Sequence, residues 1–69
     1  MVFTKKHIGK AVYCPRSQMI GIVDRIRTDK SVHFFRIYTV LVYFGGYVDS
    51  YTKDGRNHIS YEERLVLLD

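Results

Sequence analysis

Short runs of β-branched and aromatic residues, separated by turn-forming residues, dominate the chain. Residues 10–14 predict a first short strand, which ends at the chain's single proline, because proline removes an amide donor and fixes φ for a turn. Residues 19–27 predict a second strand, rich in isoleucine and valine. Gly21 within it marks a bulge or a close approach of another part of the chain. The apolar spacing over residues 23–26 breaks strict alternation and predicts a bend in this strand.

The longest β-rich run covers residues 32–44 and follows a turn predicted at residues 28–31. A helix is the competing assignment for so long a run, but its density of Val, Ile, Phe, Tyr and Thr favours a strand, either alone or preceded by a separate short one. Strand periodicity divides its apolar residues between two faces. One face carries Val40, Val42 and Phe44, and the other carries Phe35, Ile37, Leu41 and Tyr43. Both predicted faces are therefore apolar.

Two turns define the second half of the chain. The glycine pair at residues 45–46 ends the long strand, and residues 47–52 return beside it. The Asp54-Gly55 pair predicts a type I′ hairpin turn, because both central residues need positive φ, which glycine adopts freely and aspartate tolerates. Residues 56–59 then form the outgoing arm. The two-residue turn sets the pairing across this hairpin: Thr52 opposite Asn57, and Tyr51 opposite His58.

The end of the chain predicts a helical turn followed by a last strand. The Ser60-x-x-Glu63 spacing matches a capping box and predicts one helical or 3₁₀ turn. Residues 64–68 predict a strand that pairs with the first one and closes a barrel. Five to six short strands with one helical turn before the last predict an all-β chain, folded as a small SH3-like barrel rather than an OB-fold. We found no linker or repeat, so residues 1–69 are predicted to form a single domain.

Four short pieces of the chain carry a resemblance to a known group of proteins. They are Ile8-Gly9-Lys10, Gly21-Ile22-Val23, Val42-Tyr43-Phe44 and, most specifically, the Tyr-Thr-Lys-Asp-Gly-Arg run at residues 51–56. With these the chain resembles the small SH3-like barrel proteins, mostly uncharacterised, that are common in bacteriophages. The resemblance implies a fold and a phage origin, and it implies no shared catalytic residues.

The net charge and the cysteine content indicate which partners and which cellular compartment to expect. The net charge of +4 and the sequence pI of about 9.4 are compatible with binding a polyanion, although many small proteins carry such a charge for solubility. The single cysteine, Cys14, cannot close an internal disulfide, which is typical of a reducing cytoplasm. The first residues lack the apolar run of a signal peptide, and no apolar stretch approaches the roughly 20 residues that span a bilayer. We therefore expect a cytoplasmic protein that does not enter the membrane.

Groups that carry catalysis are few. Cys14 and the three histidines could in principle form a nucleophile and base pair, but cysteine next to Val-Tyr and proline is better explained as a small buried apolar residue. The histidines, His7, His33 and His58, show no ligand-like spacing for zinc. The sequence therefore predicts no enzyme activity, no metal site, no cofactor and no small-molecule substrate.

Two function classes remain open. The chain has six tyrosines and four phenylalanines, of which Tyr13, Phe34 and Phe44 are predicted to enter the core. The first hypothesis is a protein-binding module that docks on a host protein or on itself, either through an apolar face or by adding an edge strand to a partner's sheet. Its predicted interface residues are Phe35, Ile37, Leu41, Tyr43 and Tyr47.

The second hypothesis is a small nucleic-acid-binding barrel. In it, basic side chains contact phosphates and a tyrosine stacks on a base. The predicted residues are Arg25, Arg27, Lys30 and Arg56 for the phosphates, with Tyr51 or Tyr47 for the base. The basic residues are dispersed along the chain, so we rank this hypothesis second.

Overall fold

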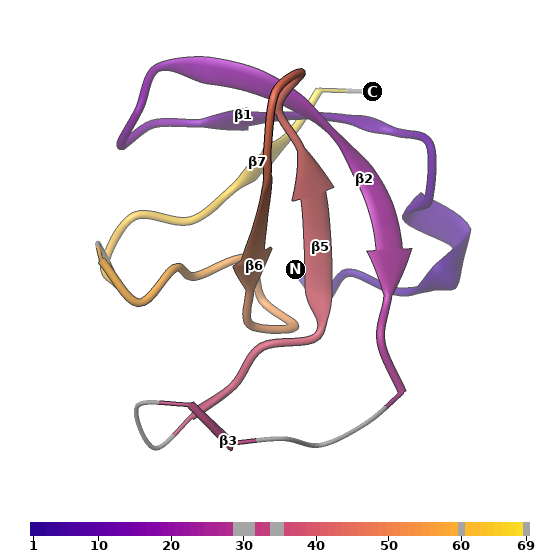
Figure 1. Ribbon diagram of the computed structural model, residues 1–69, viewed down its shortest axis with the longest axis vertical. Coiled ribbons are helices and arrows are strands. Elements are labelled where there is room, and N and C mark those ends of the chain that lie inside the picture. The colour runs from indigo at the N-terminus through magenta and orange to yellow at the C-terminus, as the bar shows by residue number, and fades with distance from the viewer. Residues whose placement is uncertain (29–31, 34–35, 60, 69) are drawn as a thin grey trace.

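The computed structural model describes residues 1–28, 32–33, 36–59 and 61–68 of the chain. Within these residues the protein is almost entirely β, with one short 3₁₀ helix. In chain order the elements are η1 (Lys5–His7), β1 (Ala11–Cys14), β2 (Met19–Ile26), β3 (Val32–His33), β4 (Arg36–Ile37), β5 (Val40–Tyr43), β6 (Val48–Tyr51) and β7 (Val66–Leu67). The main sheet has the strand order β6-β5-β2-β1-β7, whereas β3 and β4 form a separate hairpin below it (Figure 1).

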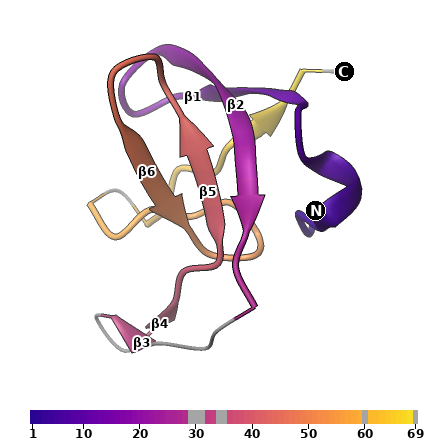
Figure 2. The same cartoon turned by 45° about the vertical axis from the view of Figure 1, so that its right-hand side comes forward.

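The main sheet is antiparallel throughout and curls toward closure (Figure 2). At one side β7 pairs with β1, with Leu67 opposite Val12, which confirms the predicted pairing of the last strand with the first. Just before β7, the amide of Leu65 donates to the carbonyl of Gly55 at 2.9 Å, in the segment that follows β6. The two ends of the sheet are thus tied together, and the protein is the small all-β barrel that the sequence predicted.

The inward positions of the strands form the core. Val40, Val42 and Phe44 are all buried, which confirms the predicted inward face of β5 and its end. The other members of the core cluster come from inward positions of β1, β2 and β6 and from segments near the two chain ends. They are Phe3, Val12, Cys14, Val23, Tyr51 and Leu65. Tyr13, which we expected in the core, is only half-buried, because it alternates with the inward Val12 and Cys14. Phe34 lies outside the described residues.

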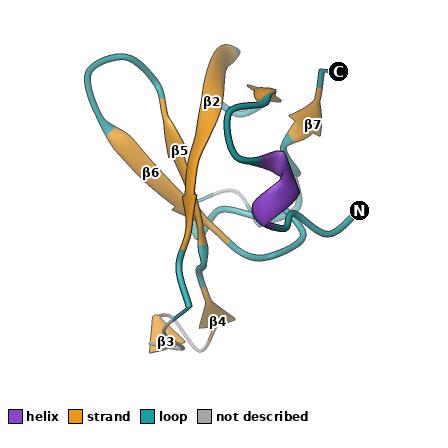
Figure 3. Cartoon of the chain, turned by 90° about the vertical axis from the view of Figure 1, so that its right-hand side faces the viewer, coloured by secondary structure: helices purple, strands orange, loops and turns teal. Residues whose placement is uncertain are grey.

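β2 crosses the core at close range and then bends. A Cβ atom added at Gly21 would lie 2.7 Å from Cγ1 of Val42 and 2.8 Å from the ring of Phe44, which confirms the predicted close approach at this glycine. Three residues later the register between β2 and β5 shifts between Val23 and Arg25, and this irregularity confirms the predicted bend. Beside the same strand lies η1 (Figure 3), and the amide of Gly9 donates to the carbonyl of Val23 at 2.8 Å.

The long β-rich run does not form one strand. β4 ends at Ile37 and β5 begins at Val40, so Ile37 lies on the small hairpin and does not share a face with Leu41, as we had expected. Tyr38, between the two segments, is only 2% exposed and contacts the ring of His58 edge-on, with the ring centroids 6.1 Å apart. It is buried like Val40, two residues later, so the side-chain alternation continues and the break lies in the pairing: β4 pairs with β3, whereas β5 pairs with β2. The predicted turn at residues 28–31 lies largely outside the described residues.

The turn at Asp54-Gly55 differs from the predicted type I′ turn. Gly55 has φ of +86°, but Asp54 does not have positive φ, and the amide of Thr52 donates to the carbonyl of Arg56. Three residues therefore close the loop, with glycine in the left-handed position, as in the common three-residue hairpin. The Asp54 carboxylate accepts hydrogen bonds from the Thr52 hydroxyl and from Nε of Arg56, the latter at 2.9 Å. These side-chain hydrogen bonds favour the three-residue loop over the predicted type I′ turn.

The longer loop changes the pairing that follows. Thr52 is bonded to Arg56 instead of lying opposite Asn57, so the predicted register was wrong by one residue. The predicted outgoing arm at residues 56–59 does not form a strand either, and Arg56 makes a single bridge with Arg64.

The helical turn lies elsewhere than we expected. Ser60 is outside the described residues, and Tyr61 and Glu62 form a hydrogen-bonded turn rather than a helix. The 3₁₀ helix of the described chain is η1, near the N-terminus. It is held by a hydrogen bond from the amide of Thr4 to Nδ1 of His7 at 3.0 Å and by an edge-on contact between the rings of Phe3 and His7.

Gly21→Ala is expected to lower the free energy of unfolding by about 1–3 kcal/mol, because the new methyl group overlaps Val42 and Phe44 in a filled core. Urea titration followed by circular dichroism measures the change. Gly46→Ala is the matched control: it has no neighbour within 4 Å and no positive φ, so it should be neutral or slightly stabilising. Equal effects at the two positions would contradict the close approach.

Asp54→Asn tests the turn through its pH dependence. Burial would raise the pKa of the Asp54 carboxyl, but the hydrogen bonds from Thr52 and Arg56 and the charge of Arg56 outweigh it, so the pKa is lowered. A lowered pKa stabilises the fold at neutral pH, and this contribution is lost as the pH falls through the pKa of the folded state. We expect the variant to be about 1 kcal/mol less stable at pH 7, with the difference shrinking below about pH 4. A difference that does not change with pH would contradict this.

Candidate binding surface

An uninterrupted row of apolar side chains crosses the outer face of the main sheet. Residues that alternate with the core positions point outward. The strand register places Ile22 beside both Ala11 and Tyr43, and Tyr43 beside Val48. At the far side the amide of Leu68 donates to the carbonyl of Ala11 at 3.0 Å, which brings Leu68 into the same row. The row therefore spans all five strands: Leu68, Ala11, Ile22, Tyr43 and Val48.

Further apolar residues widen this row on both sides. Tyr13 lies opposite Ile20 on β2 and opposite Val66 on β7, and Leu41 lies opposite Ser50. We call the whole surface the outer band, defined by Ala11, Tyr13, Ile20, Ile22, Leu41, Tyr43, Val48, Val66 and Leu68. Five of these side chains are between 46% and 49% exposed, and Ile20 is 63% exposed. The register positions inside the band carry no charged side chain.

The outer band differs from the single exposed apolar residues that are normal on protein surfaces, because its members adjoin one another. Five strands about 4.8 Å apart make its central row about 19 Å long, measured along the sheet as it curves around the barrel (Figure 2). Apolar patches larger than a few hundred Å² are uncommon on monomeric proteins and mark interaction surfaces. The continuity of the band makes it the candidate binding surface of the described residues.

Charged residues lie at the borders of the band. Arg25 is exposed and lies opposite Leu41, next to Asp24 in the bend of β2. On the opposite side Arg64 is exposed and precedes Val66 by two residues. The exposed Glu62 and Glu63 come directly before Arg64, so both borders of the band carry charges of both signs.

The predicted interface residues divide between the band and other places. Leu41 and Tyr43 belong to the band. Tyr47 is exposed beside it, stacked on Phe44 at 5.5 Å between ring centroids and hydrogen-bonded through its hydroxyl to Sδ of Met19. Ile37 is on the separate hairpin, and Phe35 lies outside the described residues. The prediction missed Ile20, Ile22, Val48 and Val66, although the alternation of Ile20 and Ile22 with Gly21 and Val23 carried the signal for the first two.

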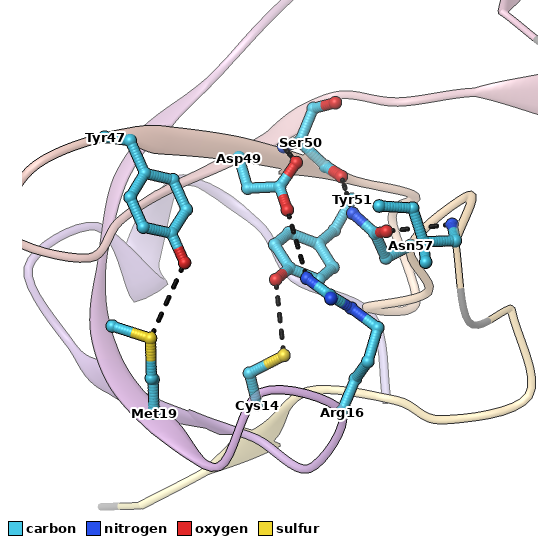
Figure 4. A network of polar contacts seen from close by, with 9 residues as sticks. Cys14, Arg16, Met19, Tyr47, Asp49, Ser50, Tyr51 and Asn57 are labelled. Atoms are coloured by element: carbon cyan, nitrogen blue, oxygen red, sulfur yellow. Dashed lines mark hydrogen bonds and ion pairs between the residues drawn. The ribbon is translucent and has the colours of Figure 1, made fainter.

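Side chains bind the outward backbone groups of one residue, Ser50, at the free edge of the sheet along β6. The amide of Phe44 bonds to the carbonyl of Tyr47, and in the antiparallel alternation this directs the backbone groups of Ser50 away from β5. The Ser50 amide donates to Oδ1 of Asp49 at 2.9 Å, and the Ser50 carbonyl accepts from Nδ2 of Asn57 at 3.0 Å (Figure 4). Both groups that a partner strand would bind at this residue are therefore occupied, as in other protected sheet edges.

Cys14 lies in a polar network at one end of the barrel (Figure 4). The Tyr51 hydroxyl donates to Sγ of Cys14 at 3.5 Å, and Arg16 lies 3.7 Å from the carboxylate of Asp49. Burial would raise the pKa of the Cys14 thiol, but hydrogen bonds from Ser17, Tyr51 and neighbouring amides outweigh it and lower the pKa. Burial and the bond to Cys14 raise the pKa of Tyr51. Cys14 is 3% exposed, which confirms the predicted buried cysteine, and its hydrogen-bond partner is a tyrosine rather than a histidine.

The predicted nucleic-acid residues differ in exposure and in their contacts. Tyr51 is 1% exposed, so the prediction that it stacks on a base is wrong: the hairpin turns this side chain into the core. Arg56 is paired with Asp54, and Nη1 of Arg56 donates to the carbonyl of Tyr61 at 3.0 Å. Arg27 donates to the carbonyl of Tyr38 at 2.6 Å.

The remaining basic candidates lie at different places. Arg25 is exposed at the border of the outer band, and Lys30 is outside the described residues. Arg36, which was not among the candidates, stacks its guanidinium 3.8 Å from the centroid of the Tyr61 ring. Arg25 and Arg27 flank Ile26, which lies opposite the buried Val40, so they lie on the outer side of the chain here, whereas Arg56 is bound to Asp54 and Tyr61.

Comparison of the chain with protein-family models, with curated proteins and with solved structures found no match. Within the described residues, no three His, Cys, Asp or Glu side chains gather in a way that could hold a metal ion. The same residues contain no helix long and apolar enough to cross a membrane. The proposal that follows therefore rests on the geometry of the chain itself.

Asn57→Ala is expected to lower the free energy of unfolding by about 1–3 kcal/mol, since it leaves two backbone groups without a partner. Asn57 is 2% exposed and bonds both to the Ser50 carbonyl and to the amide of Ile59. Urea denaturation measures the loss, and gel filtration at rising concentration should show association through the opened β6 edge. Ser50→Ala is the control, because it keeps the backbone groups and their caps. Similar stability of the two variants would show that the Asn57 bonds do not hold this edge.

Proposed function

We propose that this protein is a non-enzymatic protein-binding module that binds its partner through the outer band. The observation that carries the proposal is the row from Leu68 to Val48, which crosses all five strands with apolar side chains only. Four of its five members are nearly half exposed. A surface of this kind is favourable to cover and unfavourable to leave in water.

The contact that fits this surface is made by side chains on the face of the sheet. Strand addition, the other mode that we considered, needs free backbone groups along an edge. At β6 the groups of Ser50 are already bound by Asp49 and Asn57. At the other side of the sheet, Leu65 and Arg64 are tied to the segment that follows β6. Docking on the face therefore has more support than extension of the sheet.

A protein partner also fits the chemistry better than a nucleic acid. A phosphate backbone is bound by cationic groups set along its path. The centre of the outer band has none, and Arg27 and Arg56 donate hydrogen bonds within the protein. The resemblance of the hairpin at residues 51–56 to small phage barrels supports, as part of the same proposal, a phage accessory protein that docks on a host protein.

Ile22→Asp should weaken binding of an apolar probe to the folded protein about tenfold, because a buried isoleucine contributes roughly 1.5–3 kcal/mol to a contact. The probe is 1-anilinonaphthalene-8-sulfonate, titrated by fluorescence. Ile59→Asp is the matched control: the same substitution at an exposed isoleucine outside the band, which should leave probe binding unchanged. Near-UV circular dichroism checks that both variants remain folded.

Two results would contradict the proposal. One is probe binding that is absent from the parent protein or equally reduced in both variants. The other is binding of a mixed-sequence oligonucleotide that weakens steeply with salt and is unaffected by Ile22→Asp. Phosphate contacts made elsewhere on the barrel would give that salt dependence.

A further inference from the structure

We infer that the imidazole of His7 is a pH-sensitive cap, which holds residues 1–8 against the barrel at neutral pH and lets them detach at mildly acidic pH. The cap is one hydrogen bond, in which the amide of Thr4 donates to Nδ1 of His7 at 3.0 Å. An imidazole nitrogen accepts a hydrogen bond only while it carries no proton. Residues 1–8 lie outside the outer band, so the cap and the proposed function stand independently.

His7 occupies a position where glutamate or glutamine is usual. Thr4 is the extended residue just before η1, and His7 is the third residue of this helix. In a capping box, the side chain at the third position accepts a hydrogen bond from the amide of the residue before the helix. Glutamate and glutamine keep their acceptor at mildly acidic pH, whereas histidine loses it on taking up a proton. Histidine therefore makes this cap depend on pH.

The capped amide lies next to a buried ring. It belongs to the peptide bond that follows Phe3, and the amide of Phe3 itself donates to the carbonyl of Lys53 at 2.7 Å. The Phe3 ring is 3% exposed, lies against Gly55 and contacts the His7 ring edge-on, with the ring centroids 5.5 Å apart. Loss of the His7 acceptor thus frees the peptide that directs Phe3 into the core.

The segment is anchored separately at its other end. The amide of Gly9 donates to the carbonyl of Val23 at 2.8 Å, and the amide of Val23 donates to the carbonyl of Lys10 at 3.0 Å. These bonds join backbone groups and do not involve the imidazole. We therefore expect detachment to end before Gly9 and to leave the pairing of β1 with β2 intact.

The surroundings of His7 do not favour a positive charge on it. The side chain is buried, and burial of a charge without compensation is costly. The element packed against η1 is β2. Cations outnumber carboxylates on η1, on β2, at the residue before β1 and in the turn that binds Phe3. The charged residues there are Lys5, Lys6, Lys10, Arg25 and Lys53 against Asp24 and Asp54, and Asp54 is bonded to Arg56. The detached segment accepts the proton more readily, so a falling pH favours detachment.

Hydrogen exchange of single amides, followed by NMR, tests the cap. Between about pH 7.5 and about pH 5.5 we expect the protection factors of the Phe3 and Thr4 amides to fall several-fold, up to about tenfold. Tenfold is the change that one proton bound at about pH 6.5 gives over this range. The amides of Arg27 and Phe44, which are bonded to carbonyls of the barrel, should keep their protection factors.

Two variants separate the cap from a general effect of acid. His7→Gln supplies an acceptor that does not titrate at the same helix position, so the loss of protection at Thr4 should disappear. His58→Gln removes an exposed histidine and should leave the loss as it is in the parent. Protection at Thr4 that does not change with pH, or that falls equally in His7→Gln and in the parent, would overturn the inference.

The state of the ring is read in the parent protein, without any variant. Long-range correlation of ring protons with ring nitrogens should show Nδ1 of His7 without a proton at neutral pH. As the pH falls, the protonated ring should appear together with the loss of protection at Thr4. A His7 ring that takes up a proton while the Thr4 amide stays protected would overturn the inference.

Discussion

The β-rich runs of this chain are apolar on both faces, and a barrel of 69 residues has room inside for only one of them. In the inner set, Val12, Val23, Val40 and Val42 are each at most 1% exposed. Gly21 makes this close packing possible, because a side chain there would overlap Val42 and Phe44. The outer set has the same chemistry and remains at the surface. The exposed band is thus a direct result of strands that alternate apolar with apolar.

The rest of the fold leaves the outer face of the sheet exposed and binds backbone groups at its edges. In layered domains a second sheet or a helix covers an apolar sheet face. The helix of the described chain, η1, has three residues and lies beside β2. At the same time Asp49 and Asn57 occupy the edge of β6, and the bond from Leu65 to Gly55 ties the other end of the sheet. The outer face of the sheet is therefore the part of the described barrel that exposes most apolar side chains.

Local patterns in the sequence predicted the parts of the fold that depend on local rules. The alternation around Val40 and Val42 gave the inner face, and the glycine and the broken spacing in β2 gave its close approach and bend. The errors arose where strand pairing and side-chain hydrogen bonds decide the backbone. The pairing of β4 with β3 and of β5 with β2 divides the predicted long strand, and the bonds of Asp54 to Thr52 and Arg56 favour a three-residue loop.

The candidate site was only partly predictable for the same reason. Leu41 and Tyr43 follow from alternation in one strand, but the continuous row depends on the register between β1, β2, β5 and β6, which no single segment specifies. Tyr51 was predicted to be exposed, but it is buried. Its place near a turn suggested exposure, whereas its pairing with Val40 directs it inward to Cys14.

The central claim is that the outer band is bare in the isolated protein. Methyl NMR with a soluble paramagnetic cosolute tests it most directly, because relaxation rises with access to solvent. We expect strong relaxation of the methyl groups of Ile20, Ile22, Val48 and Val66, and weak relaxation of those of Val12, Val23, Val40 and Val42. Outer methyl groups as protected as the inner ones would contradict the account.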